Sequence, residues 1–487
     1  MSENTTKEKW YTGITKYQWL VLAICLIGWM FDIFEGQIFV ASMNEAMPSF
    51  LTETDPELRK SQAEFYNQVA LVTFLLGGTL GGVVFGMMSD RIGRKRTMAY
   101  SILFYSFFTW MTAFSGAWWH LAVLRFFVAI GVGGQWAVAS AFVAETFPSK
   151  ARAHAASIFH AFGAFGTLLA AFVGALLLGN AAVLTWCETS SLMAWSHHLF
   201  EPATLPWRLC FAIGLIPSIL VFFIFTWLKE PESWRAAKEQ AKKDSTQKVG
   251  SIADLFAKST RRSTIIGVTL AAIGMATFWG VHIRGKDALR VAAERQMIFQ
   301  VETVTEKGTD GEEKMTRKKI YSDEQRSELK RWEMLGMIIS TLGLICGQLY
   351  FGPLSQRIGR KNTFVVFHFG AFLISLVVFQ YIPGTPNAVV ALYILLPIFG
   401  FFTAGMHAGY AVYFPELFPT RLRGTGTGFC FNMGRFAASP FLLITGWMVT
   451  AGGFTLMGAL TVLSFLYLLG PVAILFAKET RGQELME

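Results

Sequence analysis

Apolar residues fall in blocks as long as a bilayer is thick, separated by short polar segments. A helix needs about 20 apolar residues to cross a membrane, so each block predicts one transmembrane helix. The predicted spans are 18–42, 66–88, 97–115, 118–142, 155–180, 208–228, 263–283, 334–356, 363–382, 388–412, 424–450 and 453–477. The pattern therefore predicts an all-α membrane protein with twelve transmembrane helices.

The composition indicates that lipid, rather than water, surrounds these helices. Hydrophobic residues make up 53% of the 487 residues and charged residues only 15%, against roughly 25% charged residues in soluble domains. The polar residues 1–16 and the long first apolar block predict no removable signal peptide. Most cysteines lie inside apolar blocks, and the Cys and His residues lack metal-ligand spacing, so we predict no disulfide framework, no metal and no cofactor.

The net charge of +9 is compatible with nucleic-acid binding, but the positions of the basic residues favour another explanation. They gather in the short loops after the second, fourth, eighth and tenth spans, whereas the loops after the third, ninth and eleventh contain no Lys or Arg. Positively charged loops stay in the cytoplasm. We therefore expect a multi-pass protein of the cell membrane, with both termini cytoplasmic and no nucleic-acid partner.

The two halves of the chain repeat each other. Residues Phe85–Lys95, after the second span, match Phe351–Lys361, after the eighth, at eight of eleven positions. Two more pairs recur in the same order, namely 145–152 with 416–423 and 229–232 with 478–481. Such repeats predict two pseudo-symmetric six-helix bundles with a solute site between them near the middle of the membrane.

The repeat sets the expected domain boundaries. They are a cytoplasmic tail 1–17, a first bundle 18–228, a cytoplasmic linker 229–262, a second bundle 263–477 with an extracytoplasmic insert 285–331, and a tail 478–487. Within the insert, residues 299–305 and 315–321 flank Gly308–Gly311 and predict a β-hairpin, and 322–332 predict a helix. We interpret the insert as a small folded cap, with a lid or partner-docking site as the alternative.

The repeated loops resemble those of the major facilitator superfamily, and the resemblance covers nearly the whole chain. Gly86–Lys95 matches the family signature G-x-x-x-D-R-x-G-R-K between the second and third spans, while the second copy has Gln356 in place of Asp90. Arg125 and Gly131–Gly134 resemble the fourth-span pattern of many proton-coupled members. The resemblance implies the major facilitator fold.

The fourth span also suggests a subfamily. Gly133–Trp136, followed by Glu145 and Pro148, is similar to the metabolite:proton and sialate or lactate:proton symporters, in which a glutamate usually stands at the position of Gln135. Glutamine cannot titrate, so this position differs in a residue that bears on coupling. Residues 231–233 and 479–482 bear a weaker resemblance to the sugar porters.

The basic loops are interpreted as gating contacts. A short glycine-bearing turn places basic side chains at helix ends, where they can pair with acids such as Glu145 or with C-terminal carbonyl groups. The alternative is that they only set the topology. The expected gating residues are Asp90, Arg91, Arg94, Lys95, Glu145, Arg152, Arg357, Arg360, Lys361, Glu416 and Arg423.

Ionisable residues inside the spans are candidates for proton coupling, because each costs about 2.5–3.5 kcal/mol at the membrane centre and so usually faces a cavity. Asp32 and Glu35 share one helical face, and Glu35 lies at the depth of Arg125 in the fourth span. Desolvation favours the protonated form of the deeper acid. We therefore predict Asp32 as the proton carrier, Glu35 second and Arg125 as their partner, with a static ion pair as the alternative.

Arg435 is the candidate anchor for a solute. It lies ~17 Å from the cytoplasmic start of its span, at ~1.5 Å per residue, and that span contains no acid. A guanidinium binds a carboxylate through two parallel hydrogen bonds, so we predict a small organic anion, such as a monocarboxylate or aromatic acid. Pairing with Asp32 is the alternative. Further candidates for the cavity wall are Asn432, Gln135, Trp136, His160, Gln348, His407, Tyr410 and Tyr413.

These expectations combine into a proton-coupled symporter that works by alternating access as a monomer in the lipid bilayer. The sequence contains no recognisable catalytic triad or phosphate loop, so we do not predict an enzyme. Three alternatives stay open, namely a sugar or other neutral-solute porter, a transporter-like sensor and a channel. The expected partners are a small-molecule substrate and protons.

Overall fold

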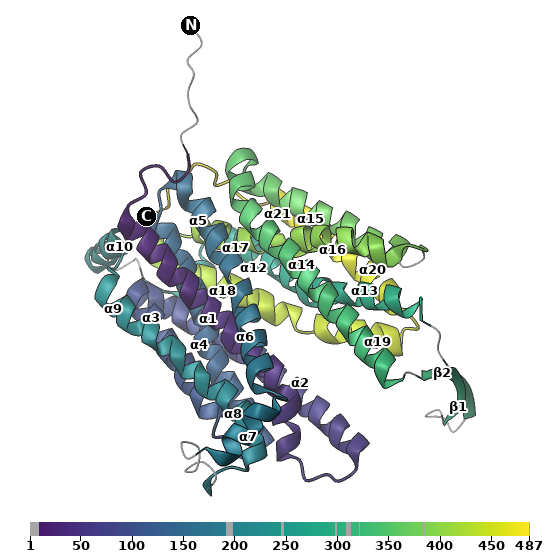
Figure 1. The fold of residues 1–487 in the computed structure, drawn as a ribbon. Coiled ribbons are helices and arrows are strands. Elements are labelled where there is room, and N and C mark those ends of the chain that lie inside the picture. The colour runs from purple at the N-terminus through teal and green to yellow at the C-terminus, as the bar shows by residue number, and fades with distance from the viewer. Residues whose placement is uncertain are drawn as a thin grey trace.

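The computed structural model describes residues 9–190, 198–244, 248–297, 300–307, 313–320, 322–382 and 385–486. It consists of two groups of long helices that lie side by side (Figure 1). Lys9 and Met486, the first and last described residues, lie at the same end of the molecule (Figure 1). We call this end the terminal face, and it also holds the loops that follow the second, fourth, eighth and tenth spans.

The first half of the chain forms six rods. The first four are single helices, α1 (Lys16–Ala46), α2 (Pro56–Ile92), α3 (Arg94–Thr112) and α4 (Trp118–Thr146). The fifth combines α5 (Ser149–Phe162) with α6 (Ala164–Leu177), and the sixth combines α8 (Leu205–Ala212), η4 (Ile213–Ser218) and α9 (Ile219–Trp227). Short elements at the opposite face are η1 (Pro48–Phe50), α7 (Ala181–Thr189) and η3 (Pro202–Thr204).

The second half forms six more rods. They are α12 (Arg261–Thr277) with η5 (Phe278–His282) and α13 (Gly285–Glu294); α14 (Asp323–Ile358); α15 (Arg360–Leu376) with η6 (Val377–Tyr381); α16 (Ala388–Gly405) with α17 (Ala408–Tyr413) and η8 (Phe414–Leu417); α18 (Arg423–Ala438) with α19 (Phe441–Thr450); and α20 (Leu456–Ser464) with η10 (Phe465–Leu468) and α21 (Leu469–Leu475). Residues Thr420–Leu422 form η9 before α18. The predicted twelve-helix fold in two bundles is confirmed.

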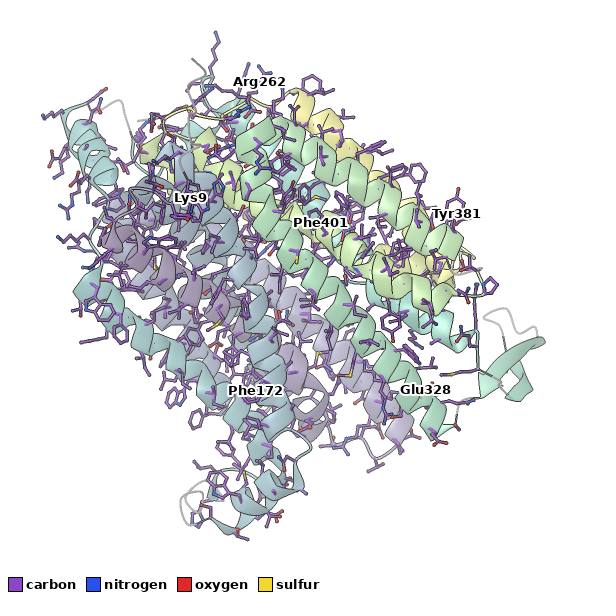
Figure 2. All side chains as sticks on the ribbon, turned by 45° about the horizontal axis from the view of Figure 1, so that its top comes forward. Lys9, Phe172, Arg262, Glu328, Tyr381 and Phe401 are labelled. Carbon is purple, nitrogen blue, oxygen red and sulfur yellow. The ribbon has the colours of Figure 1, made fainter. Side chains whose placement is uncertain are left out.

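Ten helical segments of the described chain are long and apolar enough to cross a membrane. The other two predicted spans correspond to α3 and to α18 with α19. The 19 residues of α3 begin with three basic residues, Arg94, Lys95 and Arg96, which lower its hydropathy. Pro440, which has no backbone N–H to donate, separates α18 from α19. Large apolar side chains, among them Phe222, Ile394 and Tyr381, are about two-thirds exposed on the outer helices (Tyr381 is labelled in Figure 2). A bilayer would cover such surfaces.

The insert between the seventh and eighth rods contains the predicted hairpin. β1 (Gln300–Lys307) pairs antiparallel with β2 (Glu313–Ile320), from Gln300 opposite Ile320 to Lys307 opposite Glu313. The predicted turn, Phe299 and Tyr321 lie outside the described residues. Ser322 caps the first turn of α14 through its side chain, so the expected helix is also present. The first part of the insert forms α13, which buries Ala288, Leu289 and Ala292.

The linker crosses the terminal face and contacts both halves. It contains α10 (Glu232–Lys243) and α11 (Ile252–Leu255). The Arg91 guanidinium donates to the Gly250 carbonyl at 3.2 Å, and the Gly250 amide donates to the Arg421 carbonyl at 3.0 Å. One linker residue therefore bridges the two bundles.

Candidate functional site

The two bundles pack closely where α18 crosses α2 and α4. The Thr79 hydroxyl donates to the backbone carbonyl of Asn432 at 3.5 Å, and the side-chain amide of Asn432 donates to the Gly133 carbonyl at 3.4 Å. A Cβ atom on Gly82 would lie only 1.7 Å from the Asn432 side-chain nitrogen. Glycine at position 82 is therefore what allows the helices to approach.

Arg435 lies half-buried beside this crossing. Its guanidinium carbon is 4.9 Å from the centroid of the Phe431 ring, and its Nη1 is 3.5 Å from the Asn432 side-chain oxygen. Asp32 acts on Arg435 electrostatically from α1. Within the described part of the chain, however, the ion pairs formed at 4.0 Å or less do not include Arg435. The positive charge of Arg435 therefore has no carboxylate in direct contact among the described residues.

An aromatic layer joins the bundles next to Arg435. The rings of Trp136, from the first half, and Phe431, from the second, stack with centroids 3.8 Å apart. The Trp136 indole donates to His160 Nδ1 at 3.1 Å, which leaves the proton of a neutral imidazole on Nε2. His160 in turn lies within electrostatic range of His407 and Arg435. The structure thus brings several of the predicted cavity residues together.

Other predicted cavity residues bond to the backbone of their own half. The His407 ring contacts the Gly274 carbonyl at 3.2 Å, and the Tyr410 hydroxyl donates to the Leu270 carbonyl at 3.1 Å. Gln348 donates to the Ala404 carbonyl at 3.4 Å. Tyr413 points toward the terminal face, where its hydroxyl donates to the carbonyl of Lys478 at 2.5 Å.

The two acids of α1 point into the first bundle. Asp32 and Glu35 are fully buried, and their carboxylate oxygens have no hydrogen-bond partner among the described residues. Asp32 lies beside the Tyr105 hydroxyl of α3, outside hydrogen-bond geometry. Glu35 lies 3.2 Å from where a Cβ of Gly214 would stand. Both acids are therefore shielded from solvent in this structure.

A row of hydroxyl groups lies on α3, and two of them, those of Tyr105 and Thr109, lie beside these acids. Ser101, Tyr105 and Thr109 are spaced four residues apart and are fully buried. Ser101 donates to the side-chain oxygen of Gln135 at 2.8 Å, and Thr109 lies beside Glu35. Sequence reasoning missed this row, although its four-residue spacing inside an apolar span was a readable signal.

Arg125 meets Glu35, but through the backbone. Its Nη1 donates to the Glu35 carbonyl at 3.0 Å. The guanidinium carbon lies 4.9 Å from the Phe39 ring centroid and 4.4 Å from that of Phe74. Cation–π contacts of this kind partly replace the water that a buried arginine has lost. The Glu35 carboxylate stays close enough to act on Arg125 electrostatically.

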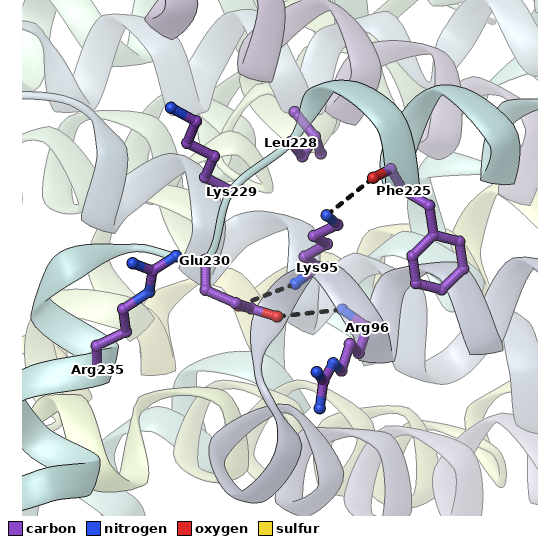
Figure 3. Close-up of a pocket in the computed structure, with 7 residues that line it drawn as sticks. All are labelled: Lys95, Arg96, Phe225, Leu228, Lys229, Glu230 and Arg235. Atoms are coloured by element: carbon purple, nitrogen blue, oxygen red, sulfur yellow. Dashed lines mark hydrogen bonds between the residues drawn. The ribbon is translucent and has the colours of Figure 1, made fainter.

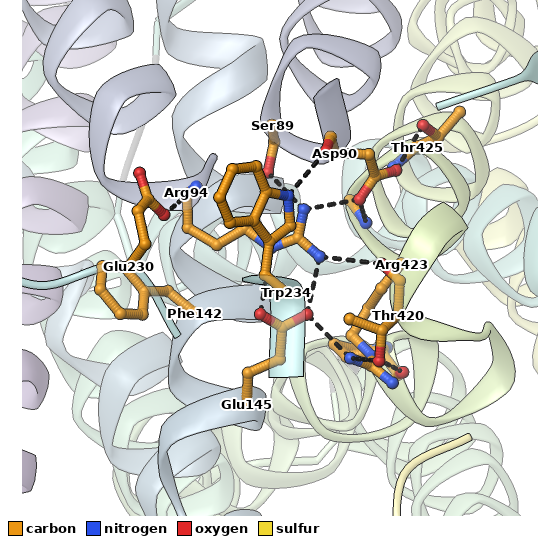
Figure 4. A network of polar contacts seen from close by, with 12 residues as sticks. Ser89, Asp90, Arg94, Phe142, Glu145, Glu230, Trp234, Thr420, Arg423 and Thr425 are labelled. Carbon is orange, nitrogen blue, oxygen red and sulfur yellow. Dashed lines mark hydrogen bonds and ion pairs between the residues drawn. The ribbon is translucent and has the colours of Figure 1, made fainter. Parts of the chain in front are cut away.

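On the terminal face, the loop of the first copy bonds to the start of α18 (Figure 4). The Asp90 carboxylate accepts from the Gly424 amide at 3.0 Å, the Thr425 amide at 2.8 Å and the Thr425 hydroxyl at 2.6 Å. A carboxylate at a helix N-terminus is favoured by the free N–H groups and the helix dipole. Trp234 of α10 donates to the Asp90 carbonyl at 2.6 Å, which ties the linker to the same point.

Glu145 holds one arginine from each bundle. Arg94 contacts it at 2.7 Å and Arg423 at 2.8 Å, and all three side chains are fully buried. Arg94 also pairs with Asp90 at 2.6 Å and donates to the carbonyl of Thr420 at 3.0 Å. These contacts close the terminal face between the halves (Figure 4).

The second copy forms a similar but weaker network. Arg360 pairs with Glu416 at 2.8 Å, and Arg152 approaches the same carboxylate at 3.8 Å. Gln356 donates to the Ser149 carbonyl at 2.9 Å. Of the remaining predicted gating residues, Arg357 is exposed.

Two lysines of these loops cap helix C-termini. Lys95 donates to the Phe225 carbonyl at 3.0 Å, and Lys361 donates to the Leu475 carbonyl at 3.2 Å. Both contacts are of the kind expected between basic side chains and C-terminal carbonyl groups.

The C-terminal tail lies in the same joint, which the sequence did not indicate. The Met486 carbonyl accepts from the Thr420 amide at 3.1 Å and from Arg423 at 2.8 Å. The Gln483 carbonyl accepts from Arg152 at 3.3 Å. Residues 483–486 therefore contact both halves.

Over the described residues, no group of His, Cys, Asp and Glu side chains is arranged to hold a metal ion.

The chain belongs to the Major Facilitator Superfamily, whose family model matches residues 19–283 and 333–484. It is therefore a multi-pass membrane transporter of small molecules, not an enzyme. It is 28% identical to a putative metabolite transport protein of Haemophilus influenzae, over 85% of this chain and 88% of that protein. It is 26% identical to a probable 4-methylmuconolactone transporter of Cupriavidus pinatubonensis, over 97% and 93% of the two chains.

A cis,cis-muconate transport protein of Acinetobacter baylyi is 25% identical over 83% of each chain. Among solved structures, a proton:xylose symporter bound to 6-bromo-6-deoxy-D-glucose aligns with a TM-score of 0.68 at 17% identity, covering 96% of this chain and 98% of that one. The likeness to this structure supports the fold.

Proposed function

We propose that this transporter moves a small organic anion together with protons across a cell membrane by alternating access, with the terminal face in the cytoplasm. The observation that carries the proposal is Arg435, a half-buried cation at the crossing of the bundles that no carboxylate pairs with in the described chain. An unpaired guanidinium in a membrane is costly. A substrate carboxylate would neutralise it through two parallel hydrogen bonds.

The aromatic layer supports a planar acid as the substrate. Trp136 and Phe431 stack at 3.8 Å beside Arg435, and flat conjugated acids stack on such rings. The relatives named for cis,cis-muconate and 4-methylmuconolactone agree with this class. A substrate that inserts between the two rings would separate the bundles at the point where they touch.

Asp32 is the proposed proton carrier. The charges of both Glu35 and Arg435 act on the Asp32 carboxylate. Its oxygens have no hydrogen-bond partner among the described residues. A substrate carboxylate on Arg435 would remove the positive field that favours ionised Asp32, so the anion and the proton would bind together. In this cycle, the state with a closed terminal face opens toward the opposite side of the membrane. The Glu145 contacts with Arg94 and Arg423 would break when the terminal face opens to the cytoplasm.

Uptake into proteoliposomes tests the substrate class. We expect saturable uptake of cis,cis-muconate or an aromatic monocarboxylate that is driven by an inward proton gradient and shows counterflow. Arg435→Gln should lower the affinity for the acid by more than tenfold, since one charge-assisted pair contributes about 1.5–3 kcal/mol. Arg331→Gln, which removes an exposed arginine on α14, is the matched control. Unchanged affinity in Arg435→Gln, or uptake of a sugar instead, would contradict an anion site.

The role of Asp32 has its own test. Asp32→Asn should retain counterflow of the acid but lose accumulation driven by the proton gradient, because the amide cannot carry a proton. If proton-driven accumulation persists in this variant, Asp32 is not the carrier, and Glu35→Gln becomes the next variant to measure. Flux that does not saturate would indicate a channel, and binding without flux a sensor.

A further inference from the structure

A basic cavity lies on the terminal face of the first bundle, and Figure 3 shows the residues that line it. None of the proposed solute-site residues is among them. Its volume is about 370 Å³, and it is lined by the start of α3, the end of α9 and the beginning of the linker. Four cations line it, namely Lys95, Arg96, Lys229 and Arg235. Neither transport nor the contact between the bundles accounts for this concentration of charge.

The single carboxylate of the cavity is already engaged. Glu230 accepts from the backbone amides of Arg94 at 2.7 Å, Lys95 at 3.2 Å and Arg96 at 3.3 Å, at the first turn of α3. Its negative charge therefore serves the N–H groups of the helix N-terminus. The four cationic side chains retain a large excess of positive charge.

The position of the cavity selects the ligand. It opens where the apolar α9 passes into the charged linker, and Phe222, Phe225 and Trp227 of α9 are exposed on the outside of the bundle. Tryptophan is enriched at the level of lipid headgroups. The Lys95 ammonium sits at this boundary, 3.0 Å from the Phe225 carbonyl and 5.8 Å from the centroid of the Phe225 ring. A lipid phosphate at that level would meet the cations while its acyl chains follow α9.

The second copy of the repeat provides an internal comparison. Lys361 donates to the Leu475 carbonyl as Lys95 does to that of Phe225, and Glu479 accepts from the first amides of α15. However, Asn362 stands where the first copy has Arg96, and it donates to its own helix at the Ile358 carbonyl. The second copy therefore lacks one of the cations that make the first cavity strongly basic.

We propose that this cavity binds the phosphate headgroup of an anionic phospholipid. Each basic residue near an anionic membrane surface strengthens the attraction about fivefold, so four of them favour an anionic lipid over a zwitterionic one. Arg94, next to Lys95, belongs to the contacts that close the terminal face. A bound lipid would hold α3 and α10 together and thereby favour the closed state.

Binding can be measured by native mass spectrometry of the purified full-length protein in mixed micelles of phosphatidylglycerol and phosphatidylcholine. We expect one phosphatidylglycerol to be retained in preference to phosphatidylcholine. The double variant Arg96→Gln with Arg235→Gln should weaken this retention about 25-fold, from two lost basic residues. Lys242→Gln with Lys243→Gln removes the same charge from α10 outside the cavity and should leave retention within about twofold of the wild type.

Three results would overturn the proposal. One is equal retention of phosphatidylglycerol by the Arg96/Arg235 variant, measured while its thermal unfolding in phosphatidylcholine matches that of the wild type. Another is equal retention of the two lipids by the wild type. The third is displacement of the lipid by millimolar inorganic phosphate, which would assign the cavity to a soluble anion.

Discussion

The two copies of the repeated loop use opposite chemistry at the same position. In the first copy, Asp90 accepts hydrogen bonds from the amides of Gly424 and Thr425, at the start of α18. In the second copy, Gln356 donates to the Ser149 carbonyl, at the start of α5. An acid is suited to the first environment and an amide donor to the second. The missing acid of the second copy is thus explained by its partner and does not mark a lost function.

The difference between the two copies also indicates how strongly each of the two helix contacts is held, that between α2 and α18 and that between α14 and α5. A buried carboxylate bound by several N–H and O–H donors contributes more than a neutral amide bonded to a carbonyl, because charge-assisted bonds are roughly twice as strong. The joint between α2 and α18 should therefore open later than the joint between α14 and α5.

Replacing Asp90 by Ala should have the largest effect. It removes the acceptor of the buried Gly424 and Thr425 amides and of the Thr425 hydroxyl, and each buried donor left unsatisfied costs about 1–3 kcal/mol. The terminal face should open. Pulsed electron paramagnetic resonance between labels at Tyr100→Cys and Val366→Cys, in a background without the five native cysteines, would measure the separation of the bundles. An unchanged distance distribution would contradict a latch at Asp90.

Gln356→Glu sharpens the comparison, because it gives the second copy an acid like the first. The new carboxylate would face the Ser149 carbonyl, now at 2.9 Å from the amide nitrogen. The variant loses the amide donor and places a carboxylate oxygen against a carbonyl oxygen, two acceptors. This change should weaken the closed state of the terminal face by about 1–3 kcal/mol. The same label pair should report partial opening, smaller than in Asp90→Ala, with Gln356→Ala as the reference. Tighter closure in Gln356→Glu would refute the idea that the partner determines the residue.

A smaller effect is expected from the tyrosines that fasten the ends of the bundles. The Tyr17 hydroxyl donates to the Lys229 carbonyl at 3.2 Å and accepts from its amide at 2.9 Å, whereas Tyr413 bonds to the Lys478 carbonyl. Removing one hydroxyl costs about 1 kcal/mol. Thermal unfolding of Tyr17→Phe and Tyr413→Phe should show small losses, and a loss comparable with that of Asp90→Ala would contradict this ranking.

The smallest effect depends on pH. Partial burial raises the pKa of Glu479, but hydrogen bonds from the amides of Arg360, Arg481 and Lys361 outweigh burial, so its pKa lies below the ordinary value. A lowered folded pKa means that the stabilisation is complete above the unfolded pKa, about 4.3, and is lost as pH falls through the folded value.

The thermal stability of the wild type and Glu479→Gln should therefore differ near pH 6 and converge toward pH 3. A difference that grows on acidification would have the wrong sign for a carboxylate cap. Gln483→Ala, which alters a neighbouring neutral side chain of the tail, should show no such convergence.

Much of the fold follows from hydropathy and from the internal repeat. Apolar blocks of membrane length define the rods, and matched loops place Arg94 near Glu145 before any coordinates are known. Both expectations depend on local patterns, which a single sequence contains. The hairpin of the insert was likewise readable from its two strands and glycine-rich turn.

The candidate site was less predictable, because it depends on helix rotation and on contacts between distant segments. The spacing of Asp32 and Glu35 shows that they share a face, but not that this face meets α3. Asp90 bonds to Thr425, 335 residues away, and no local pattern identifies that partner. The contact of Met486 with Arg423 is hidden for the same reason.

The position of residues 483–486 has a consequence for biogenesis. These residues leave the ribosome after both bundles have been made, yet they supply carbonyl groups to Arg152 and Arg423 from opposite halves. A nascent carrier therefore cannot complete the seal of its terminal face before both halves have been translated. Locking would follow the entry of both halves into the lipid.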